Sequence, residues 1–289
     1  MEQTNAAEYP WPFQPPQTSR LLLLEEGLHT ITEPIRLGRG SPWDIAAGLG
    51  PAATVVEFPN NPKGLPCFEV DAWGNQQFNQ NPALRGRGHH IGCEVRNIRC
   101  EGGGLKLEGD AVRVANVEIW RSAGIGIEIG TDRFLRESQF ENVHVRQCET
   151  GWMFGQGEPA DKTNNLTLCG CVSSYNTGSQ VTVENATRKP MVGIAWFGGL
   201  IHGRSLEATQ SRALVTIGGK CRHVSFVRTR MIGGTHPAIF EIRGGGGANA
   251  RPASIHASGS ATGRGNTELV LGDRSGLDVS GLALKRIRW

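Results

Sequence analysis

The chain has 289 residues, which is enough to bury a large core in one domain or in two smaller ones. Its net charge of +3, from 30 basic and 27 acidic residues, is too small to indicate a nucleic-acid partner. Glycine supplies 40 residues, roughly twice its usual share, and beside an ordinary apolar content of 38% this indicates many tight turns rather than disorder.

Residues 1–20 are predicted to form a separate, extended arm. The stretch YPWPFQPPQ places four prolines among aromatic residues, and proline neither donates a backbone hydrogen bond nor joins a central strand. Trp11 and Phe13 either pack on their own domain or dock the arm on a neighbouring subunit or a larger assembly. No stretch has the pattern of a secretory signal or a membrane span. We therefore expect a cytoplasmic protein or one released inside a virus particle, with a secreted mature chain as the alternative.

Residues 21–92 are predicted to form an N-terminal cap and the first coils of an all-β domain. LLLLEEGLHTITEPIRLGRG contains short alternating runs separated by glycine, and ATVVEF and CFEV are again typical of strands. SPWDIAAGLG is compatible with a single helical turn. No sustained 3.6-residue periodicity occurs anywhere in the chain, which favours an all-β fold.

A repeat begins at about residue 93 and extends to residue 289. Asn97, Asn116, Asn142 and Asn165 each lie in a strand-like run, at spacings of 19, 26 and 23 residues. A second strand-like run, opened by glycine, follows each of them, as in GGLKL and GIGIEI. Short strands that recur every 20–30 residues predict stacked coils, and loops of different lengths account for the inexact period.

An asparagine at each turn suits such a stack. Equivalent residues of successive coils lie about 4.8 Å apart. Asparagine tolerates the left-handed backbone of a turn, and its amide both donates and accepts hydrogen bonds. We therefore expect Asn97, Asn116, Asn142 and Asn165 to form a ladder, with the alternating Val, Ile and Leu residues in the core.

The sequence resembles a known superfamily in these same stretches. NVEIWRSAGIGIEIG and ENVHVRQCETGWMF resemble the pectate-lyase-like right-handed parallel β-helices, and LLLLEEGLHTITEPIRLGRG resembles the N-terminal coil of their relatives in phage tail spikes. The resemblance covers about residues 21–285. It implies a single-stranded right-handed parallel β-helix with capped ends and, for a tail-spike relative, a homotrimer. It singles out no activity, because the superfamily includes lyases, hydrolases, epimerases and non-enzymatic viral proteins.

Charged residues beside the GIGIEI strand form the candidate catalytic site. A lyase needs a base for the proton beside a uronate carboxylate and a cation for the resulting anion. The sequence lacks the NTD, DD and GHG motifs of the superfamily's pectin hydrolases, so acid catalysis of that kind is not supported. The alternative is that these are ordinary charges on exposed turns. The candidates are Arg121, Asp132, Arg133, Arg136, Glu137, Glu158 and Asp161.

Four aromatic residues are candidates for carbohydrate binding, because sugar rings stack on flat apolar faces. Trp120, Trp152, Tyr175 and Trp196 recur in successive coils. Trp152 and Trp196 lie within alternating runs, which favours the core for both, whereas Trp120 precedes a turn and is the better candidate for exposure.

No cofactor or metal site is predicted. HHIGC lacks a clear fourth zinc ligand, and no acidic cluster has a calcium-binding spacing. The seven cysteines include no CxxC pair, which favours free buried thiols, including those of LCGC at Cys169 and Cys171. The basic end KRIRW, 285–289, is expected to be solvated.

Two functions from different classes follow. The first is a virion structural protein, a tail spike, fibre or particle-surface protein that contacts other virion proteins through residues 1–20 and presents a flank to bacterial surface polysaccharide or a receptor. The alternative is a lyase or hydrolase of acidic polysaccharide. A scaffold that makes only protein–protein contacts is a third, weaker hypothesis.

Overall fold

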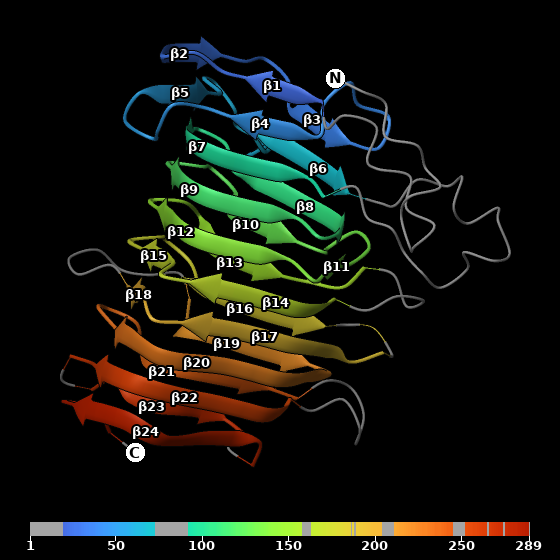
Figure 1. Cartoon of the computed structure of the whole chain (residues 1–289). Coiled ribbons are helices and arrows are strands. Elements are labelled where there is room, and N and C mark those ends of the chain that lie inside the picture. The colour runs from blue at the N-terminus through green and yellow to red at the C-terminus, as the bar shows by residue number, and fades with distance from the viewer. Residues whose placement is uncertain are drawn as a thin grey trace, which may run out of the picture.

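The described part of the chain is a solenoid of parallel strands. The computed structural model describes residues 20–72, 92–157, 163–185, 187, 189–203, 211–244, 252–264, 266–273 and 275–288. These residues form 24 strands and no helix, and the strand pairs are all parallel. The strands are stacked in chain order, from β1 and β2 at one end to β24 at the other (Figure 1). The fold is a right-handed parallel β-helix, as expected.

Each coil contributes to three flat sheets. Sheet 1 contains β3 (Ile35–Gly38), β6 (Phe68–Ala72), β8 (Leu105–Asp110), β10 (Ile125–Ile129), β13 (Thr150–Phe154), β16 (Val181–Asn185), β19 (Ala213–Gly219), β21 (Ala238–Arg243) and β23 (Glu268–Gly272). Sheet 2 begins with β1 (Leu21–Leu23) and β4 (Ile45–Ala47) and includes β14 (Asn164–Cys169) and β17 (Met191–Phe197). Sheet 3 begins with β2 (Gly27–Thr30) and β5 (Thr54–Glu57) and includes β15 (Val172–Ser174) and β18 (Leu200–His202).

Six longer strands bend and serve both sheet 2 and sheet 3. They are β7 (Glu94–Glu101), β9 (Arg113–Trp120), β12 (Gln139–Arg146), β20 (Cys221–Ile232), β22 (Ala253–Thr262) and β24 (Leu277–Lys285). The short β11 (Leu135–Arg136) lies between sheets 1 and 2 and pairs with β8 and β14.

Three of the four predicted asparagines form a ladder where β7, β9 and β12 bend. Asn97, Asn116 and Asn142 have left-handed backbones, with φ of 57°, 52° and 51°. The amide of Asn116 donates to Asn97 Oδ1 at 3.2 Å, and that of Asn142 donates to Asn116 Oδ1 at 2.9 Å. Each bend therefore supplies both the backbone angle and the hydrogen bond that asparagine provides.

The fourth asparagine lies in another row, so its predicted place in the ladder is wrong. Glu141 pairs with Cys169, which places Gly170 rather than Asn165 in register with Asn142. Asn165 follows Asn164, the partner of Arg136, and so belongs to the bend between sheets 1 and 2. The prediction fails because the bends of this coil are spaced differently along the chain. Here β14 lies in sheet 2 and β15 in sheet 3, whereas one bent strand spans both sheets in the preceding coils.

The core consists of inward-facing side chains stacked from coil to coil. In sheet 2, Phe140, Leu168, Trp196 and Phe226 follow one another in register and are fully or almost fully buried. Trp152 of sheet 1 meets Trp196 edge to face, with ring centroids 5.2 Å apart. Alternation along each strand therefore directs the large apolar side chains to one interior, as the sequence predicts.

Some local expectations are corrected, and others fall outside the described residues. The helical turn considered for SPWDIAAGLG is wrong, because β4 lies there. Six cysteines are buried, but Cys169 is exposed at the end of β14. The predicted arm lies outside the described residues except for Arg20. Within the described part, no helix is long and apolar enough to cross a membrane.

Candidate functional site

The predicted catalytic residues do not form one site. Arg121 precedes β10 and Asp132 follows it, so the two lie at opposite ends of a strand of sheet 1. Glu137 is exposed at the bend after β11, with φ of 50°. Glu158 and Asp161 lie outside the described residues. The prediction that Arg121 and Asp132 belong to a common site is therefore wrong, because the length of a strand separates them.

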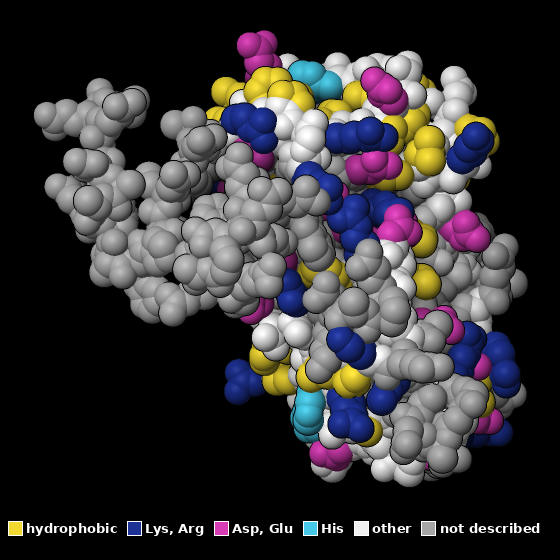
Figure 2. Space-filling view, turned by 90° about the vertical axis from the view of Figure 1, so that its right-hand side faces the viewer, with side chains coloured by type: hydrophobic (Ala, Val, Ile, Leu, Met, Phe, Trp, Pro, Cys, Tyr) yellow, Lys and Arg dark blue, Asp and Glu magenta, His cyan; other side chains and the backbone are white. Residues whose placement is uncertain are grey.

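Asp132 and Arg133 are engaged in ion pairs with sheet 1. Lys106 Nζ lies 2.5 Å from Asp132 Oδ2, and the guanidinium of Arg133 lies 3.2 Å from Asp71 Oδ2. On the side of the solenoid shown in Figure 2, basic and acidic side chains are interspersed. Among the described candidates, Asp132 and Arg133 are therefore both engaged by oppositely charged side chains of sheet 1.

Glu108 holds the loop that carries these two residues. Its carboxylate accepts backbone N–H bonds from Asp132, Arg133 and Phe134 at 3.0, 3.1 and 3.2 Å. Burial raises the pKa of Glu108 to about 7. The N–H donors and Lys106 favour the charged form and lower the pKa, but burial is the larger effect. Glu108 is therefore an anchor for the loop.

Arg136 is likewise part of the framework. Its guanidinium lies 2.5 Å from Asp110 Oδ1 and 4.6 Å from the centre of the Phe134 ring. Among the described residues, no group of three or more His, Cys, Asp or Glu side chains is arranged to bind a metal ion. The charges around β10 therefore stabilise the coils at this end of sheet 1.

Two of the four aromatic candidates cannot bind sugar. Trp152 and Trp196 are completely buried, so their assignment as carbohydrate-binding residues is wrong. The ring of Trp152 packs edge to face against those of Trp196 and Phe140. Apolar and polar residues alternate along their strands, so both side chains point inward. The sequence favoured this core position for both residues.

Trp120 is partly buried between two cations on the outer face of sheet 3. The guanidinium carbons of Arg99 and Arg146 lie 4.4 and 5.1 Å from its ring centroid. Arg99 also pairs with Glu118 at 3.3 Å, which fixes its position. The faces of the Trp120 ring are thus occupied by the protein's own side chains.

Tyr175 is the aromatic candidate that the structure leaves exposed. It is 42% exposed and lies at the bend that follows β15, with φ of 59°. Its ring centroid lies 4.8 Å from that of His202, which comes from the next coil. Together the two rings form an aromatic surface at the end of sheet 3. His202 lies in GLIHG, which lacks the first glycine of a GHG motif.

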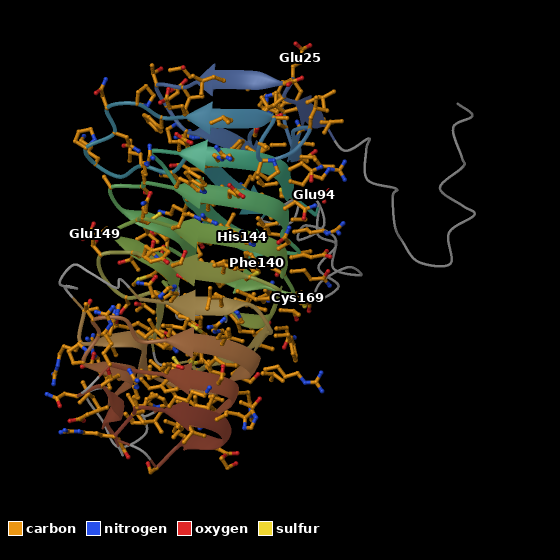
Figure 3. The ribbon with its side chains drawn as sticks, turned by 90° about the vertical axis from the view of Figure 1, so that its left-hand side faces the viewer. Glu25, Glu94, Phe140, His144, Glu149 and Cys169 are labelled. Atoms are coloured by element: carbon orange, nitrogen blue, oxygen red, sulfur yellow. The ribbon has the colours of Figure 1, made fainter. Side chains whose placement is uncertain are left out.

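Trp120 and His202 belong to one line of side chains that runs along sheet 3, and Tyr175 lies next to it. Figure 3 shows sheet 3, with His144 near its middle and Glu149 beyond the bend that follows it. The last position of sheet 3 before this bend is occupied in successive coils by one row, which we call the edge row; within it, Ser174 is only 4% exposed. Over eight steps of about 4.8 Å it extends roughly 38 Å. The edge row is Glu57, Glu101, Trp120, Arg146, Ser174, His202, Ile232, Thr262 and Lys285.

Two cavities open along the edge row, one towards each end. The N-terminal cavity has a volume of about 570 Å³, and its walls include Glu57, Pro59, Asn61, Glu101 and Arg121. The C-terminal cavity has a volume of about 420 Å³, and its walls include His202, Ile232, Thr262, Arg264, Lys285 and Arg286. Both cavities are open to solvent on one side.

The second cavity was missed in the sequence because its residues come from four successive coils. Lys285 and Arg286 are exposed, as expected for the basic end KRIRW, and both also line this cavity. The only local indication was the run of basic residues itself. Its neighbours His202 and Thr262 are brought there by register.

Comparison with known proteins supports the fold. No protein-family model matches the sequence. No curated protein matches it either. Among solved structures, ORF18 of Geobacillus virus E2 is similar with a TM-score of 0.52 and 12% identity, over 91% of this chain and 52% of that one. This chain therefore spans about half the length of ORF18.

Two carbohydrate-active proteins show weaker similarity. The A-module of mannuronan C-5 epimerase AlgE4 of Azotobacter vinelandii has a TM-score of 0.45 and 14% identity, over 92% of this chain and 91% of that one. The catalytic domain of a GH87 α-1,3-glucanase has a TM-score of 0.36 and 11% identity, over 93% and 65%. The expected parallel β-helix fold is confirmed, and at these identities the comparisons bear on the fold alone.

Proposed function

We propose that this β-helix presents a polysaccharide-binding flank on a virus particle, with the edge row as the binding surface. The observation that carries the proposal is that both cavities and the exposed Tyr175 lie along one row of the solenoid. A polymer with a repeating unit suits a row of side chains that recur at a regular rise, because successive units can contact successive coils.

The particle context is part of the proposal. ORF18, which shares the fold, is a viral protein. A homotrimer, and contacts with other virion proteins through residues 1–20, are further parts of the same proposal. Secretion to another extracellular surface would use the same flank.

A glycoside hydrolase is the second candidate, because of two carboxylates in the N-terminal cavity. Glu57 and Glu101 are register partners in adjacent coils, and both line that cavity together with Arg121. Adjacent parallel strands are about 4.8 Å apart, which is compatible with the carboxylate separation of about 5–5.5 Å in retaining glycosidases. An enzyme would therefore place its chemistry at Glu57 and Glu101, away from Asp132.

Calorimetric titration with polygalacturonate and with neutral dextran tests the proposal. Replacing Tyr175 with Asn removes the ring but keeps a residue that tolerates positive φ. We expect Tyr175→Asn to weaken binding about tenfold, or about 1.4 kcal/mol. Phe197→Asn is the matched control, because Phe197 is also 42% exposed but lies on the outer face of sheet 2.

Three outcomes would count against the binding flank. They are no binding of either polymer, an unchanged affinity in Tyr175→Asn, and an equal loss in Phe197→Asn. Release of reducing ends during the titration, abolished by Glu57→Gln or Glu101→Gln, would favour the hydrolase.

A further inference from the structure

The C-terminal cavity of the edge row is strongly basic. Arg264, Lys285 and Arg286 all line it, and none of its described lining residues is acidic. Within the described part of the chain, no salt bridge joins any of these three side chains to a carboxylate, whereas Arg99, Arg133 and Arg136 each have an acidic partner. Three unneutralised cations around one concave site create a positive potential there.

The remaining walls are suited to a sugar. Ile232 contributes an apolar side chain and Thr262 a hydroxyl. Tyr175 stands beside the cavity through its contact with His202. Burial, with the nearby Arg230, lowers the pKa of His202, so its ring is neutral at pH 7 and keeps one N–H donor and one acceptor. An aromatic surface, a hydroxyl and a neutral imidazole are partners for a polyhydroxylated ring.

We infer that this cavity binds the anionic group of an acidic glycan, a uronate carboxylate or a sulfate ester, with Lys285 and Arg286 as its charged partners and the Tyr175–His202 pair against the sugar ring. The inference rests on the proposed glycan-binding flank and specifies the ligand as acidic. Arginine and lysine form their strongest hydrogen bonds with anionic oxygen, which directs an acidic unit to this end of the edge row. A free inorganic anion would use only the cations, and a nucleic acid would need a longer stripe of charge than one cavity provides.

The test is calorimetric titration of the full chain with four probes: trigalacturonate, the neutral maltotriose, inorganic sulfate and a single-stranded DNA oligonucleotide. The double variant Lys285→Gln/Arg286→Gln removes two charges from the cavity. Arg39→Gln/Arg222→Gln is the matched control, because both arginines are exposed and the net charge changes equally. Circular dichroism and the thermal midpoint confirm that each variant is folded.

We expect wild type to bind trigalacturonate at least tenfold more tightly than maltotriose or sulfate. The cavity variant should lose at least tenfold in affinity for trigalacturonate, with less than a twofold change for the control. The affinity should also fall as salt is raised from 50 to 500 mM, because an ionic contact is screened.

Other outcomes would overturn the inference in distinguishable ways. Equal affinity for maltotriose and trigalacturonate, with no effect of the cavity variant, removes the acidic-glycan inference and leaves the binding flank intact. Sulfate binding as tight as trigalacturonate binding indicates a free-anion site. Tighter binding of a single-stranded DNA oligonucleotide assigns the cavity to another class of polymer. If neither sugar binds, the proposed function fails together with the inference.

Discussion

At the scale of single residues, left-handed backbones recur at equivalent bends of successive coils. Arg121, Gln147 and Tyr175 occupy equivalent positions after sheet 3, with φ of 59°, 58° and 59°. Glu137 and Asn165 occupy equivalent positions before sheet 2, with φ of 50° and 54°. Residues other than Asn and Gly therefore adopt the left-handed conformation here. Contacts with the coils on either side offset the free-energy cost of that conformation.

Glu108 provides a prediction on pH. Burial raises the pKa of its carboxyl to about 7, whereas an unfolded chain releases the same proton near 4.3. Between these values the folded state holds the proton and the unfolded state does not, so rising pH favours unfolding. Relative to Glu108→Gln, the free energy of unfolding of wild type should fall by up to roughly 3 kcal/mol between pH 4.5 and 7.5.

Urea titrations at a series of pH values provide the measurement, and taking the difference between the two proteins cancels the other titrating groups. Parallel stability curves for wild type and Glu108→Gln would show that the carboxyl is ionised throughout this range in the folded protein.

At the scale of elements, the contacts depend on where each strand bends. β7, β9 and β12 each bend at an asparagine, which allows three amides to form a ladder. In the next coil, β14 ends at Cys169 and Gly170 takes the place in register after Asn142. The ladder therefore stops because of a glycine, although the bend itself continues with φ of 64°.

Gly170→Asn should extend the ladder and stabilise the protein by about 1 kcal/mol. A Cβ at Gly170 would have no heavy atom within 4 Å, and asparagine adopts positive φ readily. The new amide would donate to Asn142 Oδ1, in the direction of the existing two bonds. Gly170→Ala is the control, because alanine pays the left-handed cost without the hydrogen bond.

Urea denaturation of the three proteins checks this prediction. A ranking of Asn above Gly above Ala agrees with it, whereas equal stability of the Asn and Ala variants would mean that no ladder bond forms.

At the scale of the whole molecule, stability is shared between neighbouring coils. Each internal coil bonds to one coil above and one below, but β1, β2 and β3 pair on one side only, within the described residues. The first coil also exposes apolar side chains, with Leu21, Leu23 and Leu28 at 45%, 58% and 62%. Stacked coils therefore open most easily from an end.

Native-state hydrogen exchange should reveal this gradient. We expect the slowest amides in the central strands β9, β12 and β14, and exchange at least tenfold faster in β1, β2 and β24, because the end coils can open without breaking the stack. Mass spectrometry of peptic peptides gives the rates. Equal protection of β2 and β12 would mean that the stack opens only as a single unit.

The sequence by itself determined the strands, the inward direction of the large apolar side chains and the parallel stacking. These depend on alternation within a few residues and on Asn and Gly at the turns, so the local pattern records them. It also favoured the core for Trp152 and Trp196, where the structure places them.

Only the tertiary structure decided which coils bring which side chains together. Coil length varies from turn to turn, so a spacing along the chain does not fix register between coils. Asn165 therefore lies outside the ladder, and Arg121 and Asp132 lie at opposite ends of β10. For the same reason, His202 and Lys285 line one cavity although 83 residues (285 − 202) separate them. Contacts between coils are set by hydrogen-bonded register, and register depends on the length and geometry of each turn as well as on the alternation within each strand.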